Sequence, residues 1–145
     1  MFVHLQFERL NYYNIHDLVD FCKQCEGCPD ITEEQANLYC HVLEPELPSV
    51  RTYGAFDGNQ LVGILTAEFF LVFPGKAVPS GRCTAVMGLY SLPKYSLGEI
   101  SAGILKLVKK DSEAFGADGV FSYGLSGKVD FQSDDSFGFK TLAEL

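Results

Sequence analysis

The chain has 145 residues and a mass of 16.0 kDa, enough for one domain with a substantial core, so we expect residues 1–145 to form a single domain. Hydrophobic residues make up 47% of it and charged residues 21%, which excludes a disordered or low-complexity chain. The 19 acidic and 11 basic residues give a net charge of −8, which argues against a protein that binds the nucleic-acid backbone.

Neither a targeting signal nor a membrane span is expected from the sequence. The first residues lack the basic region and small-residue cleavage site of a signal peptide. The longest apolar run, Phe69–Phe73, is far shorter than the roughly 18 residues of a membrane helix. Five cysteines, an odd number, favour reduced thiols. We therefore expect a cytoplasmic protein without a membrane partner.

The first quarter of the chain predicts a strand and then two helices. Alternating aromatic and aliphatic residues indicate a strand over Phe2–Phe7. Apolar residues at helical spacing predict a helix that opens at Asn14 or Asp17. A second helix is expected to begin at Thr32, because Gln35 stands three residues later and completes a capping-box pattern.

The middle of the chain predicts a hairpin. Two strand-like runs, Arg51–Phe56 and Gln60–Val72, flank the sequence Asp57-Gly58-Asn59, and an Asp-Gly pair is a strong signal for a tight turn between antiparallel strands. The segment Phe73–Gly81, with two prolines and two glycines, is expected to be a loop.

The second half of the chain alternates strand and helix. Strands are predicted over Cys83–Leu92 and Gly119–Leu125, and the apolar stripe of Glu99–Phe115 predicts the longest helix. Asp130–Phe137 predicts a helical turn and Phe139–Leu142 a short final strand. The whole order predicts a mixed α+β fold in which a crossover helix creates one parallel pair of strands.

The run Leu89–Leu105, LYSLPKYSLGEISAGIL, resembles the segment of the GNAT superfamily in which the fourth strand is followed by a phosphate-binding loop and a long helix. Gly119–Leu125 resembles that family's later aliphatic strand, and Ser133–Lys140 resembles its segment ending in Gly-Phe. The likeness covers nearly the whole chain. It implies a mixed central sheet, βααβββαβα(β), splayed between the fourth and fifth strands, with helices on both faces and a last strand that is short or missing.

The resemblance implies an acetyl-CoA-dependent N-acetyltransferase that acts on a small amine or a Lys side chain. The backbone of Leu89–Ser91 would face the pantetheine arm, and Ser96–Ser101 would face the pyrophosphate. A helix N-terminus suits such an anion, because its N–H groups and dipole favour negative charge. The implied cofactor-binding residues are Leu89, Tyr90, Ser91, Ser96, Leu97, Gly98, Glu99, Ile100 and Ser101.

The phosphate loop departs from the family pattern. Glu99 and Ser101 stand where the family has small residues, and Gly98 lies one position early. The sequence Ser96-Leu97-Gly98-Glu99 instead forms a capping box, in which the Glu99 carboxylate is expected to bond back to the Ser96 amide. Two unit charges ~4 Å apart at an effective dielectric near 20 repel by about 4 kcal/mol, so this carboxylate is expected to weaken acetyl-CoA binding.

The catalytic positions differ as well. Asp134 stands where the family has the tyrosine that protonates the leaving thiolate, and Met87 stands where it often has a general-base Glu. Tyr123 and Tyr90 are the candidate replacements, unless they are packed or interface aromatics. An acidic cluster around Asp134, with Asp130 and Asp135, would attract an amine or form a solvated turn.

These departures support an alternative function. The chain would then be a catalytically degenerate GNAT-fold module that does not use acetyl-CoA and serves as a binding or structural element for a protein partner or a second copy of itself.

The spacing Cys22-x-x-Cys25-x-x-Cys28 is compatible with a metal or iron–sulfur site. Such a site needs a fourth ligand, and only Cys40 or His41 is near in sequence. In the alternative interpretation Cys22 packs on the apolar face of the first helix, while Cys25 and Cys28 lie in an exposed turn. We expect no metal.

Overall fold

The computed structural model describes residues 4–42, 44–122 and 140–145. In the described residues one six-stranded sheet follows chain order, from β1 at one edge to β6 at the other. The strands are β1 (Leu5–Arg9), β2 (Ser49–Asp57), β3 (Gln60–Leu71), β4 (Arg82–Ser91), β5 (Gly119–Ser122) and β6 (Lys140–Thr141). The helices are α1 (Ile15–Gln24), α2 (Glu33–Tyr39) and α3 (Leu97–Phe115), with 3₁₀ turns η1 (Tyr12–Asn14) and η2 (Leu142–Glu144).

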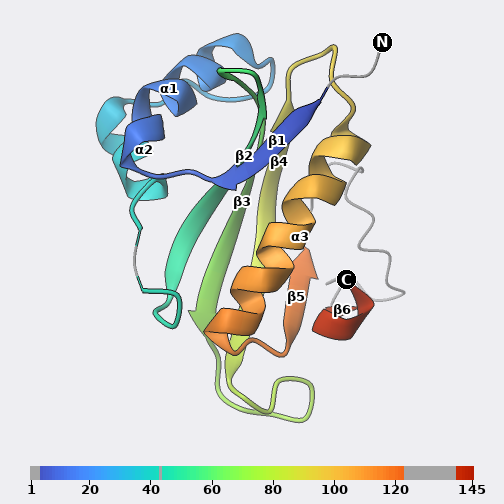
Figure 1. Cartoon of the computed structure of the whole chain (residues 1–145). Helices are drawn as coiled ribbons and strands as arrows, with labels where there is room; N and C mark the ends of the chain where they lie inside the picture. The colour runs from blue at the N-terminus through green and yellow to red at the C-terminus, as the bar shows by residue number, and fades with distance from the viewer. Residues whose placement is uncertain (1–3, 43, 123–139) are drawn as a thin grey trace.

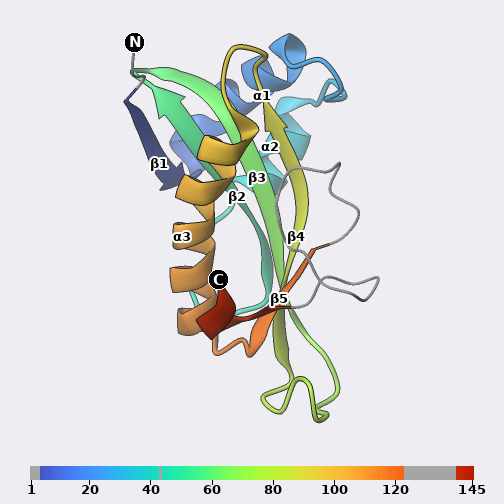
Figure 2. The same cartoon turned by 90° about the vertical axis from the view of Figure 1, so that its right-hand side faces the viewer.

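The sheet lies between two helical layers (Figure 1, Figure 2). α3 packs on β1, β2, β3 and β4 from one face. α1 packs on β3 and α2 on β2 from the other face. This arrangement is the expected α+β fold with helices on both faces.

Most of the sheet is antiparallel: a tight turn joins β2 to β3, and a longer loop joins β3 to β4. β4 and β5 are parallel, and α3 supplies the crossover that a parallel pair requires. The turn between β2 and β3 places Gly58 at a φ of 62°, a left-handed conformation that glycine adopts without strain. The predicted Asp-Gly hairpin is confirmed.

β4 changes register near its middle. On the β5 side its described pairs run to Val86 and Ser122, where the described part of β5 ends, while β4 itself continues to Ser91. On the other side, β3 pairs Thr66 with Gly88 and Ala67 with Val86, so Met87 is an extra residue in a β-bulge. The bulge shifts the register between β3 and β4 by one residue.

The helices begin and end where local chemistry satisfies their free backbone groups. The predicted capping box of α2 is present, since the Thr32 hydroxyl accepts from the Gln35 amide at 3.1 Å and the Gln35 side chain accepts from the Thr32 amide at 2.9 Å. α3 ends at Gly116, whose φ of 80° forms a left-handed cap. α1 buries one apolar face, as its spacing predicts.

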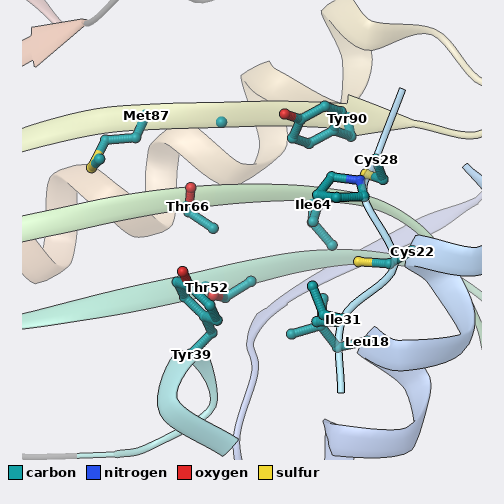
Figure 3. Close-up of a pocket in the computed structure, with 12 residues that line it drawn as sticks. Leu18, Cys22, Cys28, Ile31, Tyr39, Thr52, Ile64, Thr66, Met87 and Tyr90 are labelled. Carbon is teal, nitrogen blue, oxygen red and sulfur yellow. The ribbon is translucent and has the colours of Figure 1, made fainter. Parts of the chain in front are cut away.

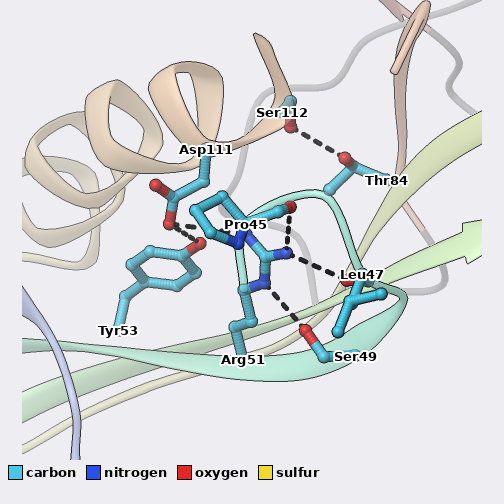
Figure 4. A network of polar contacts seen from close by, with 8 residues as sticks. All are labelled: Pro45, Leu47, Ser49, Arg51, Tyr53, Thr84, Asp111 and Ser112. Carbon is cyan, nitrogen blue, oxygen red and sulfur yellow. Dashed lines mark hydrogen bonds and ion pairs between the residues drawn. The ribbon is translucent and has the colours of Figure 1, made fainter. Parts of the chain in front are cut away.

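A polar network crosses the otherwise apolar layer between α3 and the sheet (Figure 4). Arg51 on β2 is only 1% exposed, and its guanidinium donates to the backbone carbonyls of Pro45 and Leu47. It lies 4.0 Å from the Asp111 carboxylate, which also accepts a hydrogen bond from the Tyr53 hydroxyl at 2.5 Å. The network ties β2 to both α3 and the segment that precedes β2.

The sequence predicts most of these elements to within a few residues. The described part of the first strand runs to Arg9, beyond its predicted end at Phe7. The described part of the last strand is short, Lys140–Thr141. The predicted turn at Asp130–Phe137 lies outside the described residues. No helix in the described part of the chain is both long enough and apolar enough to cross a membrane.

Candidate cofactor edge and acceptor pocket

The N-terminal turn of α3 is capped by one side chain. The Ser96 hydroxyl accepts a hydrogen bond from the Glu99 amide at 3.3 Å. The N–H groups of Leu97 and Gly98 have no hydrogen-bond partner in the part of the chain that the structure describes. Two backbone donors therefore point outward from the positive end of a 19-residue helix.

The predicted reciprocal bond from Glu99 is absent among the described residues. The Glu99 side chain is exposed and does not bond to the Ser96 amide. An exposed carboxylate gains little from such a bond, because water competes for it. Ser101 is also turned away from the loop, since its buried hydroxyl donates to the carbonyl of Gly98 at 3.1 Å. The N-terminus of α3 is thus less obstructed than the sequence suggests.

The end of β4, which is paired with β3, leads directly into this turn. Leu89 packs against the core, and Tyr90 on the opposite face is 36% exposed. The Ser91 hydroxyl donates to the carbonyl of Tyr95 at 3.4 Å, and the Tyr95 hydroxyl donates to Asp57 at 2.6 Å. These bonds hold the short connection between β4 and α3. The structure therefore places Leu89–Ser91 and Ser96–Ser101, which the sequence analysis singles out, at the same end of the sheet.

A pocket of about 280 Å³ lies on the other face of the sheet, beside the bulge (Figure 3). α1 and the segment after it form one wall, α2 contributes Tyr39, and three strands form the floor. The lining residues are Leu18, Cys22, Cys28, Pro29, Ile31, Tyr39, Thr52, Ile64, Thr66, Met87, Gly88 and Tyr90.

Thr52, Thr66 and Gly88 form one row across the pocket floor. Thr52 pairs with Thr66 between β2 and β3, and Thr66 pairs with Gly88 between β3 and β4. Thr52 is 1% exposed, and its hydroxyl has no hydrogen-bond partner in the described part of the chain. The floor thus contains a buried hydroxyl group within a mostly apolar lining.

Comparison with solved structures identifies the architecture. Arabidopsis thaliana NAA60 in complex with acetyl-CoA superposes with a TM-score of 0.62 at 15% identity, over 82% of this chain and 74% of that chain. The PaiA N-acetyltransferase of Thermoplasma acidophilum in complex with coenzyme A gives 0.62 at 13% identity, over 92% and 96%. The ribosomal-protein-alanine N-acetyltransferase of Brucella melitensis gives 0.62 at 15% identity, over 86% and 82%. The chain has the GNAT fold.

Structural similarity at this level of sequence identity establishes the fold, whereas the activity has to be inferred from the residues of the site. A scan of protein-family models finds no match, and neither does a search of curated protein sequences.

The described catalytic candidates of this GNAT fold lie on β4. Met87 occupies the bulge, is 45% exposed and brings no carboxylate to the pocket. The Tyr90 ring lies over Gly88, where an added Cβ would come within 3.2 Å of that ring and of the Thr66 hydroxyl. Tyr123 and Asp134 lie outside the described residues, and so do Asp130 and Asp135.

Two of the three neighbouring cysteines, Cys22 and Cys28, are protonated thiols in this environment. Burial raises the pKa of Cys22 and that of Cys28. Cys25 is 5% exposed and Cys28 is half-buried, so the predicted exposed turn is wrong for Cys25. The segment folds back onto the end of β4, where the Cys25 thiol lies 3.5 Å from the Ser91 carbonyl. The described residues contain no cluster of side chains suited to a metal ion.

The sequence does not predict the pocket floor. Thr52 and Thr66 carry no motif, and they become neighbours only through strand register. Gly88 was not singled out either, although a glycine within a strand is a signal for a bulge or a close approach.

Proposed function

We propose that the chain binds acetyl-CoA and transfers its acetyl group to an amine held in the pocket. One observation carries the proposal: β4 runs directly into the N-terminus of α3, where the N–H groups of Leu97 and Gly98 have no hydrogen-bond partner among the described residues. An extended arm can lie along the end of β4, and an anion can meet the helix end.

The residues present fit such a ligand. The N–H groups of Leu97 and Gly98 would hold the pyrophosphate, and Gly98 leaves space there, because among the described residues an added Cβ would meet only the Ser96 hydroxyl, at 3.5 Å. The backbone of Leu89–Ser91 would hold the pantetheine arm. When bound, acetyl-CoA supplies an activated thioester whose carbonyl an amine can attack directly.

The pocket and β4 supply the remaining functions. The walls of the pocket exclude water from an amine that is held against its floor beside Met87. We assign the proton donation to the leaving sulfur to Tyr90, the described member of the two tyrosine candidates. Tyr123 and Asp134 remain candidates outside the described residues.

A second function is favoured by two different observations. Met87 stands in the bulge instead of a carboxylate, and the Ser96 hydroxyl already occupies one of the helix amides. Both are compatible with a binding or structural module that does not use acetyl-CoA.

Calorimetric titration with acetyl-CoA separates the two functions. We expect micromolar binding that weakens as salt is added, because the pyrophosphate contact is electrostatic. Glu99→Gln should tighten it about fivefold, since an exposed charge next to the anion is removed. Glu113→Gln, at the exposed opposite end of α3, changes net charge equally and should leave binding unchanged. No heat at millimolar acetyl-CoA would exclude the proposed transferase and leave the module.

A further inference from the structure

The pocket beside the bulge has a neutral lining. None of its twelve described lining residues is Asp, Glu, Lys or Arg. An ionised group that enters such a site loses hydration and gains no counter-charge, and this is costly. The lining therefore disfavours the protonated alkylamines that the net charge of −8 would otherwise attract.

The floor of the pocket carries hydrogen-bonding capacity that the protein does not use. The Thr52 hydroxyl is buried and has no hydrogen-bond partner among the residues that the structure describes, and Thr52 lies directly opposite Thr66 across the β2–β3 pair (Figure 3). A buried hydroxyl without a partner destabilises the folded chain, whereas a ligand that bonds to it recovers that free energy. Adjacent strands lie about 4.8 Å apart, so Thr52 and Gly88, two strands apart, are separated by roughly 10 Å.

We infer that the pocket binds a small, largely apolar molecule that is uncharged at neutral pH and places a neutral hydrogen-bonding group on Thr52. If the chain is the proposed transferase, on which this identity as acceptor rests, the molecule is a weakly basic amine such as an aromatic amine. Its amino group lies toward β4, and its neutral polar group lies at the opposite side of the pocket floor, at Thr52 on β2. Such an amine is already deprotonated near pH 7, which is consistent with Met87 standing where a base would be needed for an alkylamine.

Two probes of the same shape test the charge preference. 4-Aminobenzamide is uncharged at neutral pH, whereas 4-aminobenzamidine carries a cationic amidinium in place of the amide. Titration of each probe by protein-detected NMR, without acetyl-CoA, should show 4-aminobenzamide binding at least tenfold more tightly. Equal binding, or tighter binding of the amidine, would overturn the inference.

Two matched variants test the contact. Thr52→Val keeps the shape and removes the unpartnered hydroxyl, so it should weaken 4-aminobenzamide binding about fivefold without lowering the melting temperature. Thr84→Val removes the other kind of buried hydroxyl, one that bonds to Ser112 at 2.7 Å on the opposite face. It should lower the melting temperature and leave binding unchanged. Unaltered probe binding in Thr52→Val would show that the hydroxyl does not contact the ligand.

The outcome is separable from that of the proposed function. Probe binding is measured in the absence of acetyl-CoA, and transfer is measured separately as release of free coenzyme A thiol with 4-aminobenzamide. Probe binding without release would reject the transferase and retain the inference. Release with an alkylamine that is faster than release with the aromatic amine would reject the inference and retain the transferase.

Discussion

Arg51 shows how a single residue constrains this fold. Its guanidinium is buried among backbone carbonyls and lies 3.8 Å over the ring of Phe69. Burial lowers its pKa and the nearby Arg9 adds to the effect, while the charge of Asp111 opposes it. The buried cation therefore depends on a carboxylate that belongs to another element, α3.

Replacing that carboxylate should destabilise the fold. In Asp111→Asn the side chain keeps its shape and can still accept from Tyr53, but Arg51 loses its counter-charge. Because Asp111 is itself partly exposed, we expect a loss of about 2 kcal/mol, less than for a fully buried pair. Urea denaturation measures it.

The exposed Asp20 on α1 provides the control, since Asp20→Asn makes the same charge change and should be nearly neutral. Asp111→Asn should also cost much less in an Arg51→Met background, because the cation is then gone. An equal cost in both backgrounds would show that the ion pair contributes nothing.

Single residues also mark the limit of what the sequence can predict. The hairpin turn is evident in Asp57-Gly58-Asn59, and simple counting from the pair Asp57–Gln60 would place Thr52 opposite Leu65. A register shift at Ala55 and Phe56 places Thr52 opposite Thr66 instead. A one-residue slip exchanges the two faces of a strand, so the pocket floor could not be derived from the turn alone.

At the scale of elements, α3 illustrates the difference between local and tertiary information. Its Ser96 cap and its Gly116 terminus follow from local chemistry, and both are present. The Glu99 half of the capping box is not formed, because the Glu99 carboxylate is exposed and water competes for it. What fixes α3 against the edge strand β1 is a contact that no local pattern indicates, in which the ring of Phe7 lies against the backbone of Gly103.

Gly103→Ala tests this contact between elements. An alanine is favoured over glycine within a helix by up to ~1 kcal/mol, but here the new methyl group would collide with the Phe7 ring. We expect the collision to prevail and the free energy of unfolding to fall by about 1–2 kcal/mol. Thermal and urea denaturation give the value.

The same substitution should change sign when Phe7 is truncated. In a Phe7→Ala background the space is free, so Gly103→Ala should be neutral or stabilising through helix propensity. A loss of the same size in both backgrounds would show that the glycine is required for some reason other than the ring.

At the scale of the molecule, element order and the crossover helix were sufficient to predict the α+β class and the helices on both faces. The candidate cofactor edge followed from a resemblance over Leu89–Leu105, and its two segments do lie together. The pocket beside the bulge did not follow, because it is assembled from residues of α1, α2 and three strands that are far apart in sequence. Local sequence patterns predict helices and strands, whereas a pocket depends on how those elements pack against one another.

Alkaline pH should weaken the whole fold through its buried thiols. Burial raises the pKa of Cys40 to about 11, with a contribution from Asp17, and burial together with Asp118 raises that of Cys83 to about 11. In the unfolded chain a thiol ionises near pH ~8.5. Between these values the unfolded state binds fewer protons than the folded state, so the free energy of unfolding falls as pH rises. Their stabilising contribution is complete below pH ~8.5 and is lost toward pH 11.

Urea midpoints at pH 7.5 and 10, measured in reducing buffer, should therefore fall for the unmodified chain. Cys40→Ala and Cys83→Ala should each be less stable at pH 7.5, because a buried group is removed, yet each should lose less on going to pH 10. Lysine and tyrosine titration is common to all three proteins and cancels in this comparison. If the three midpoints fell in parallel, the thiols would not be the groups that couple folding to alkaline pH.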